Sequence, residues 1–235
     1  MKVKKRLNKS KFKLIKEGFW VSFTEYLMLG AIFIANVVIN RKYGTEVLGE
    51  FSIGYSLAQI LIFGMGSAFT PLIRKELTIS DKNSNALISN VIHLRILLFV
   101  LVIILSYFIN YFFFNEQELY FIFIIFSISK SLDLLSDTIY TYYQSVDRIK
   151  IYSLLKSSHS FAVIGLVLFV FLYDLSKYYI YYSFIFISFL FVLINLFFII
   201  KDKALKVSID NFFYLKGDEK ILLKNAIPII TNSFI

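Results

Sequence analysis

Seven long apolar segments dominate this chain and decide what it can fold into. Most of them reach the length of about 20 residues that a helix needs to cross a lipid bilayer. Backbone amides in hydrocarbon must be hydrogen-bonded within the chain, so such segments are predicted to be helices. We place the segments at about 18–39, 47–72, 88–113, 119–143, 155–173, 178–200 and 221–235.

The composition supports the same class. Hydrophobic residues make up 58% of the 235-residue chain, whereas soluble domains contain roughly 45–50%. We therefore predict an all-α, polytopic transmembrane helix bundle. It comprises a basic tail (1–17), a six-helix lobe (18–200), an inter-lobe loop (201–220) and the truncated start of a seventh helix (221–235). Because the last segment is too short for a full span, we expect the sequence to be a fragment or an open reading frame cut short.

The distribution of lysine and arginine predicts the orientation of the chain in the membrane. Of the 25 basic residues, 20 lie in the tail and in segments that would share its side of the membrane, and three lie on the other side. Cytoplasmic loops carry such an excess, so the N-terminus and the loop 201–220 are predicted to be cytoplasmic. The membrane topology then accounts for most of the net charge of +9, and the basic segments favour contact with anionic lipids. We expect no nucleic-acid partner.

The sequence contains no motif that indicates catalysis or a cofactor. There is no cysteine, which excludes disulfide and zinc-thiolate chemistry. No metalloprotease, P-loop, nucleophile-elbow or dinucleotide-binding pattern occurs. His93 and His159 stand alone, each near a predicted cytoplasmic helix end, which favours interfacial packing over metal binding. We expect neither an enzyme nor a cofactor.

Three motifs carry a resemblance to a known family. The stretch YGTEVLGEFS, which starts at Tyr43, resembles the loop and helix start after the first span of bacterial polysaccharide flippases. The stretch LIRKE, which starts at Leu72, is typical of the end of the next helix in that family. The pattern Q-x-x-x-R-x-K-x-Y, from Gln144 to Tyr152, also matches. The family contains the O-antigen and teichoic-acid exporters, within the superfamily of multidrug, oligosaccharidyl-lipid and polysaccharide exporters.

The resemblance implies a fold and a cargo. Members of the family have twelve to fourteen helices in two lobes around a central cavity, and they work by alternating access. The implied cargo is a polyprenyl-pyrophosphate-linked oligosaccharide, flipped from the cytoplasmic to the outer leaflet of the cell membrane for surface polysaccharide synthesis. This chain has about half the family's length, so the partners it implies include a C-terminal lobe and a proton or sodium counter-ion.

The fourth apolar segment carries a polar stripe. Helical spacing places Lys130, Asp133, Asp137 and Gln144 on one face, together with Tyr140 and Thr141. Charged residues within a membrane span are rare unless they face a cavity or a partner. The stripe is therefore a candidate cavity wall that descends from the bilayer midplane to the cytoplasmic mouth.

Two explanations of the stripe remain open. In the first, Lys130 pairs with Asp133 while Arg95, from the neighbouring third span, holds Asp137, and these pairs fix the helix packing. In the second, the cations Lys130 and Arg95, with Gln144, bind an anionic headgroup, and Asp133 and Asp137 carry a coupling ion. The two are compatible, because paired charges exchange partners when a substrate arrives.

Glu25 is a further intramembrane acid, on a face of the first span with Ser22, Leu29, Asn36 and Asn40. A carboxylate at this depth is a candidate for proton or cation coupling. The alternative is a polar contact to a neighbouring hydroxyl group, or a water-filled crevice near the inner surface.

Other functions fit the same pattern of spans. A multidrug exporter would use the acids to attract organic cations. A membrane glycosyltransferase or polymerase would need large acidic and Arg-rich outer loops, and the outer loops of this chain are short. The remaining possibility is that the chain is an inactive fragment.

Overall fold

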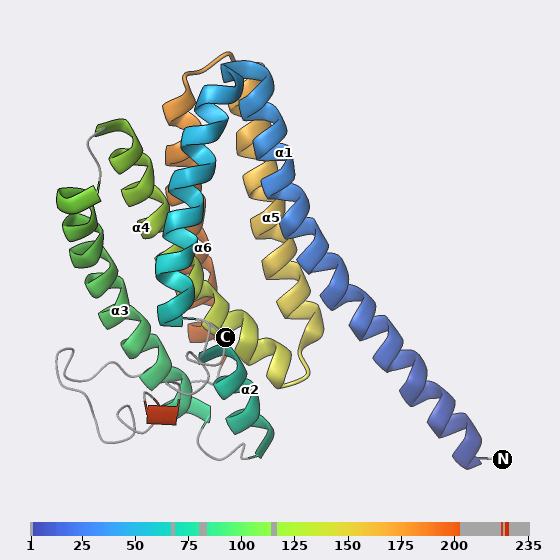
Figure 1. The fold of residues 1–235 in the computed structure, drawn as a ribbon. Helices are drawn as coiled ribbons and strands as arrows, with labels where there is room; N and C mark the ends of the chain where they lie inside the picture. The colour runs from blue at the N-terminus through green and yellow to red at the C-terminus, as the bar shows by residue number, and fades with distance from the viewer. Residues whose placement is uncertain are drawn as a thin grey trace.

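The chain folds into an all-helical bundle (Figure 1). The computed structural model describes residues 2–66, 69–79, 84–113, 117–202, 222 and 224–225, and these residues contain no strand. Most of the predicted loop 201–220 and of the predicted seventh helix at 221–235 lies outside the described residues. The helices are α1 (Lys2–Gly66), α2 (Phe69–Ile79), α3 (Ser84–Phe113), α4 (Gln117–Ser145), α5 (Ile149–Leu172) and α6 (Lys177–Lys201).

Gly44 divides α1 into two arms that run in opposite directions (Figure 1). Its φ of 90° and ψ of 177° are non-helical, and glycine adopts a positive φ without the steric cost that a Cβ imposes. The first arm comprises residues 2–43 and the second arm residues 45–66. With the two arms counted separately, the five long apolar helices make the six passes that the sequence predicts.

The second span was predicted at 47–72, and its predicted end lies beyond the end of the long helix in the structure. The loop expected at 73–87 is partly helical. The long helix stops at Gly66, and α2 is a separate, short helix. It buries Ile73 and Leu77 against the bundle and exposes Arg74 and Lys75. In the sequence, the apolar face of this amphipathic helix merges with the hydrophobic run before it, so the boundary was missed.

The predicted basic tail is also helical, because α1 begins at Lys2 and continues into the first span. The N-terminal part of α1 slants away from the other helices, and its end lies far from the bundle (Figure 1). The bend at Gly44 and the α5–α6 turn lie at the opposite end of the bundle from α2 and the α4–α5 turn. We call these the Gly44 end and the α2 end.

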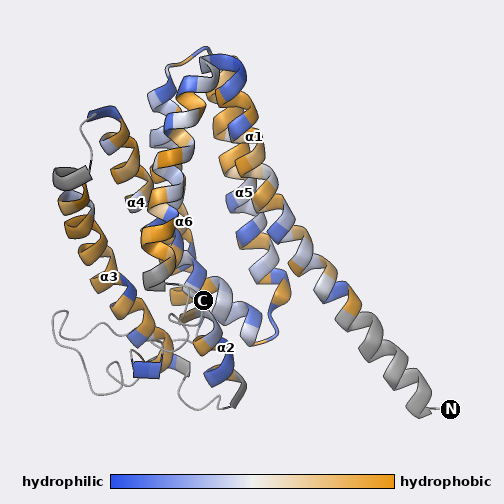
Figure 2. Ribbon diagram, viewed as in Figure 1, coloured by the Kyte–Doolittle hydropathy of each residue, from blue (hydrophilic) through white to orange (hydrophobic). Residues whose placement is uncertain are grey.

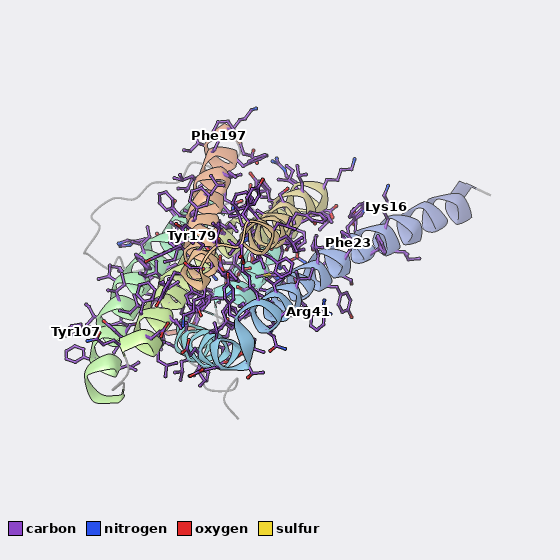
Figure 3. All side chains as sticks on the ribbon, turned by 90° about the horizontal axis from the view of Figure 1, so that it is seen from above. Lys16, Phe23, Arg41, Tyr107, Tyr179 and Phe197 are labelled. Carbon is purple, nitrogen blue, oxygen red and sulfur yellow. The ribbon has the colours of Figure 1, made fainter. Side chains whose placement is uncertain are left out.

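Large apolar side chains cover the outside of the bundle. Within the described ranges, five helices are long and apolar enough to cross a membrane, and hydrophobic residues line their length (Figure 2). Aromatic side chains such as Tyr107 of α3 and Tyr179 and Phe197 of α6 are exposed on the outside of the bundle (Figure 3). A soluble protein buries such groups, whereas a bilayer solvates them. The chain is therefore a multi-pass membrane protein.

Helix α4 lies at the centre and packs against each of the other five helices. Two apolar clusters form the core around it. One lies toward the α2 end and includes Ile73, Ile88 and Ile139. The other lies toward the Gly44 end and includes Phe51 and Phe126. Between Phe126 and Ile139, α4 changes from apolar to polar residues, and this interval holds the site described next.

Candidate functional site

A layer of buried polar side chains separates the two apolar clusters. In α4 the buried residues of the two clusters stop at Phe126 and resume at Ile139, apart from partly buried neighbours. We call the buried polar side chains in this interval of α4, with those of the neighbouring helices that lie at the same level, the polar layer. Its buried members are Arg95 of α3, Ser127, Ser129, Lys130, Ser131, Ser136 and Thr138 of α4, His159 and Ser160 of α5, and Ser188 and Asn195 of α6.

The charged pair at the centre of the polar layer is Lys130 with Asp133. The Nζ atom of Lys130 lies 3.2 Å from Oδ2 of Asp133, one helical turn away on α4. The Lys130 amine also lies 4.8 Å from the centroid of the Tyr55 ring, which is contributed by the second arm of α1. Since the Lys130 side chain is only 9% exposed, the pair and the ring replace the water that the ammonium group has lost.

Asp133 also joins α4 to α5 and α6. The Ser188 hydroxyl donates a 2.7 Å hydrogen bond to Oδ1 of Asp133, and a 2.9 Å hydrogen bond connects the hydroxyls of Ser188 and Ser129. On the other side, Nε2 of His159 lies 3.7 Å from Oδ1 of Asp133. The imidazole stacks on Phe191, with the ring centroids 4.7 Å apart, and this contact holds it in place. One carboxylate thus connects three helices.

A small cavity of about 20 Å³ adjoins this group and is lined by Lys130, Asp133, His159, Ser160 and Ser188 with apolar neighbours. A void of this size holds about one water molecule, and the lining offers the polar partners that a buried water needs. The site is therefore closed to larger molecules in this conformation.

Arg95 forms the second charged group of the polar layer. Its Nη2 lies 3.6 Å from Oδ2 of Asp137, and its side chain is fully buried. The Thr70 hydroxyl accepts a 3.2 Å hydrogen bond from Arg95 and donates a 2.8 Å hydrogen bond to Asp137. Arg95 also donates to the hydroxyl of Thr138 and to the carbonyl of Leu134. The pairing of Arg95 with Asp137 that the sequence predicts is confirmed, and it joins α3 and α2 to α4.

Gln144 lies outside the polar layer, near the α2 end. Its side-chain oxygen accepts a 2.8 Å hydrogen bond from Arg74 of α2. It therefore continues the stripe predicted on α4, and its partner in this conformation is an exposed cation.

Glu25 is also separate from the polar layer. Its carboxylate lies 2.5 Å from Nζ of Lys156 and accepts a 2.9 Å hydrogen bond from the hydroxyl of Tyr152, and both partners belong to α5. The predicted contact with a neighbouring hydroxyl is therefore present. The Glu25 side chain is 49% exposed, so this acid stays accessible at the junction of α1 and α5.

His159 is the residue that the sequence places wrongly. Its side chain is buried beside Asp133 in the polar layer, although interfacial packing near a helix end was expected. The reason is a helix boundary. Because α5 begins at Ile149, six residues before the predicted start, His159 lies well inside the helix. If the predicted span had been extended back toward Arg148, His159 would have been placed inside the helix.

Ser188, Thr70 and Lys156 were not singled out from the sequence. Each gains its role only through a partner far away in the chain, and a lone serine or threonine in an apolar run gives no signal of its own. Within the part of the chain that the structure describes, no group of three or more histidine and acidic side chains is arranged to hold a metal ion.

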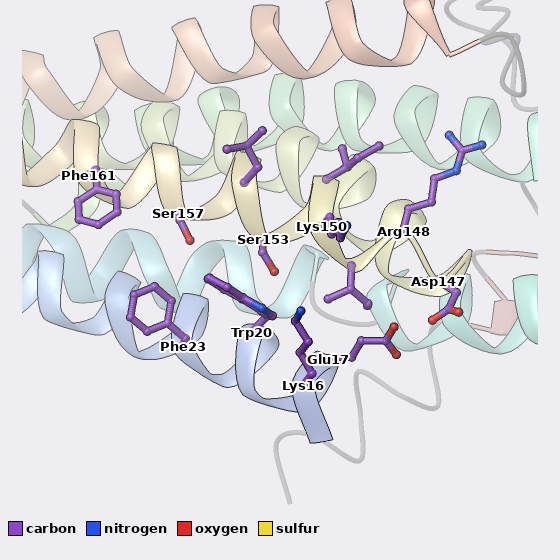
Figure 4. Close-up of a pocket in the computed structure, with 13 residues that line it drawn as sticks. Lys16, Glu17, Trp20, Phe23, Asp147, Arg148, Lys150, Ser153, Ser157 and Phe161 are labelled. Carbon is purple, nitrogen blue, oxygen red and sulfur yellow. The ribbon is translucent and has the colours of Figure 1, made fainter. Parts of the chain in front are cut away.

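A groove of about 870 Å³ lies outside the polar layer, between the first arm of α1 and α5 (Figure 4). Its lining combines apolar side chains, among them Trp20, Phe23 and Phe161, with charged ones near the α4–α5 turn. Asp147 in that turn has a φ of 60°, a left-handed conformation that aspartate tolerates better than most residues.

Comparison with protein-family models, with curated proteins and with solved structures found no match to this chain.

Proposed function

We propose that this protein is a membrane transporter that flips a polyprenyl-pyrophosphate-linked oligosaccharide from the cytoplasmic to the outer leaflet by alternating access. The observation that carries the proposal is the polar layer, which crosses the middle of an otherwise apolar membrane bundle. Buried charges inside a membrane are costly and mark substrate and ion pathways. A bundle that needed only to be stable would gain more from apolar packing at these positions.

The chemistry of the layer suits a headgroup that hydrocarbon excludes. A sugar pyrophosphate loses its water when it enters a bilayer, and replacement polar partners lower that cost. Lys130 and Arg95 are the cations for the pyrophosphate, and Gln144 offers an amide nearer the α2 end. Asp133 and Asp137 neutralise the two cations when no substrate is bound, as they do in this conformation.

The acids also provide a route for coupling. Asp133 lies beside the imidazole of His159, so two groups that commonly take part in proton transfer in proteins meet at this point. A proton on either group changes the charge that faces Lys130. Glu25, half exposed at the α1–α5 junction, is a second candidate for carrying a proton or sodium. In the proposed orientation the α2 end and the N-terminus face the cytoplasm.

The test is complementation. The protein is expressed in a bacterial strain that lacks its own polysaccharide flippase, and export of the lipid-linked sugar to the outer leaflet is measured together with efflux of cationic dyes. Restored export without dye efflux is the expected result. Dye efflux without export would replace the proposal by a multidrug exporter, and a correctly inserted protein that does neither would reject transport of both classes.

Two variants connect that result to the polar layer. Lys130→Ala should abolish export, whereas Lys201→Gln, which removes a cation from the exposed end of α6, should leave export unchanged. Equal losses in both variants would show that total charge, and not the polar layer, governs the activity.

A further inference from the structure

We propose that the groove between the first arm of α1 and α5 is a binding site for an anionic phospholipid, whose acyl chain lies along its apolar wall and whose phosphate lies at its charged mouth. This inference goes beyond the transport of a sugar-linked lipid and does not depend on it. It rests on three properties of the groove: its shape, its unpaired cations and the helix terminus that opens onto it.

The apolar wall suits a lipid chain. The volume of about 870 Å³ lies in the range of roughly 300–1,000 Å³ that is usual for ligand sites. Trp20 packs edge-on against Phe23, with the ring centroids 6.0 Å apart, and both side chains line the groove on its α1 side (Figure 4). Leu154 and Phe161 line the opposite side and are 60% and 56% exposed. Because the groove lies on the outer face of a membrane helix pair, hydrocarbon reaches it directly.

The mouth of the groove carries two cations that form no ion pair within the part of the chain that the structure describes. Lys16 of α1 and Lys150 of α5 line it, and neither makes an ion pair with any residue that the structure describes. Arg148 also lines the mouth, but it is paired with Asp202. The acids Glu17 and Asp147 are present as well, and each has an interaction partner of its own. The three cations of the mouth outnumber its two acids, and two ammonium groups beside an apolar wall attract an anionic amphiphile.

The start of α5 adds to this attraction. Its N-terminal turn contains no acidic residue, and the residue that precedes it, Arg148, forms no side-chain cap. The first N–H groups of a helix and the helix dipole favour an anion at this position. Ser153 and Ser157 follow along the same wall and supply hydroxyl groups below the mouth (Figure 4).

The protein contains a built-in reporter of this site, because Trp20 is its one tryptophan. The purified protein is placed in phosphatidylcholine vesicles that contain the same mole fraction of either brominated phosphatidylglycerol or brominated phosphatidylcholine. Bromine quenches tryptophan fluorescence on contact. We expect phosphatidylglycerol to quench Trp20 more strongly than phosphatidylcholine does, and inorganic phosphate in the buffer to leave this difference unchanged.

The double variant Lys16→Gln with Lys150→Gln should lower the preference for the anionic lipid by roughly 25-fold, since each basic residue near a membrane surface contributes about fivefold. Quenching by the zwitterionic lipid should persist, which shows that the groove is intact. The control pair Lys75→Gln with Lys201→Gln removes the same charge outside the groove and should keep the preference.

A second control moves the reporter. Trp20→Phe with Tyr26→Trp places the indole on an exposed part of α1 that does not line the groove, and both lipids should quench it equally. Equal quenching of Trp20 itself by the two lipids would overturn the proposal. An equal loss of lipid preference in the control pair Lys75→Gln with Lys201→Gln would also overturn it. The absence of any quenching of Trp20 would overturn it as well, because it would mean that part of the protein covers the groove.

Discussion

The guanidinium group of Arg95 lies 3.6 Å from the carboxylate of Asp137, yet the two side chains differ in their access to solvent. The Arg95 side chain is fully buried, and that of Asp137 is 35% exposed. The loss of Arg95 and the loss of Asp137 should therefore destabilise the protein to different extents. Without Asp137, a buried cation has only neutral partners, whereas without Arg95, the acid keeps its hydrogen bond from Thr70 and an exposed edge.

We predict that Asp137→Asn destabilises the protein more than Arg95→Met does. An uncompensated buried charge costs about 3–5 kcal/mol, and the exposed carboxylate left by Arg95→Met should cost less. The double variant Arg95→Met with Asp137→Leu should recover much of the stability, because no charge stays buried. Thermal unfolding of the purified protein measures all three, and the reverse order of the single variants would contradict this account.

Variants of Lys130 distinguish a role of this residue in substrate binding from a role in helix packing. If Lys130 binds the pyrophosphate, Lys130→Ala abolishes export while the protein level stays near normal, and Lys130→Arg keeps partial activity because the positive charge persists. In the alanine variant Asp133 retains the hydrogen bond from Ser188 and still has His159 3.7 Å away, and these contacts limit the destabilisation. Export and abundance are measured in the same cells.

The double variant Lys130→Ala with Asp133→Ala decides between substrate binding and packing as the role of Lys130. We expect it to be inactive, because the cation is still missing. Recovery of both abundance and export in the double variant would instead reduce Lys130 to a packing partner of Asp133.

Gly54 allows the second arm of α1 to approach α4 closely. A Cβ atom at this position would lie 2.6 Å from Cγ2 of Ile122 and 3.3 Å from the backbone nitrogen of Phe123. Gly54→Ala should therefore lower stability by about 1–3 kcal/mol. Ile122→Ala in the same protein should relieve the clash. Gly165→Ala is the matched control, since an added Cβ there meets nothing within 4 Å, and its unfolding temperature should not fall.

The orientation is tested by cysteine labelling, which is direct because the sequence contains no cysteine. We expect Lys75→Cys on α2 to react with a membrane-impermeant reagent only after the cells are permeabilised. Thr45→Cys, next to the bend at Gly44, should react in intact cells. The opposite pattern would invert the proposed topology.

The sequence alone was sufficient to predict the six long helical passes of the described residues, because each is encoded locally. A run of about 20 apolar residues meets the length of the bilayer and the need for internal backbone hydrogen bonds. The predicted bounds of the fourth and sixth spans, 119–143 and 178–200, match α4 and α6 within two residues at each end. The prediction failed where an amphipathic helix followed a span, as at α2, because hydrophobicity continues across such a boundary.

The sequence also determined which side chains of α4 share a face, since helical periodicity places Lys130, Asp133 and Asp137 in one stripe. Only the tertiary structure decided what each of them contacts. Ser188, His159 and Thr70 reach the stripe from three other helices and lie 26–67 residues from their partners along the chain. Helix packing brings them together, and one-dimensional periodicity contains no information about which faces of separate helices meet. For the same reason, the groove between α1 and α5 appears only once the angle between these helices is known.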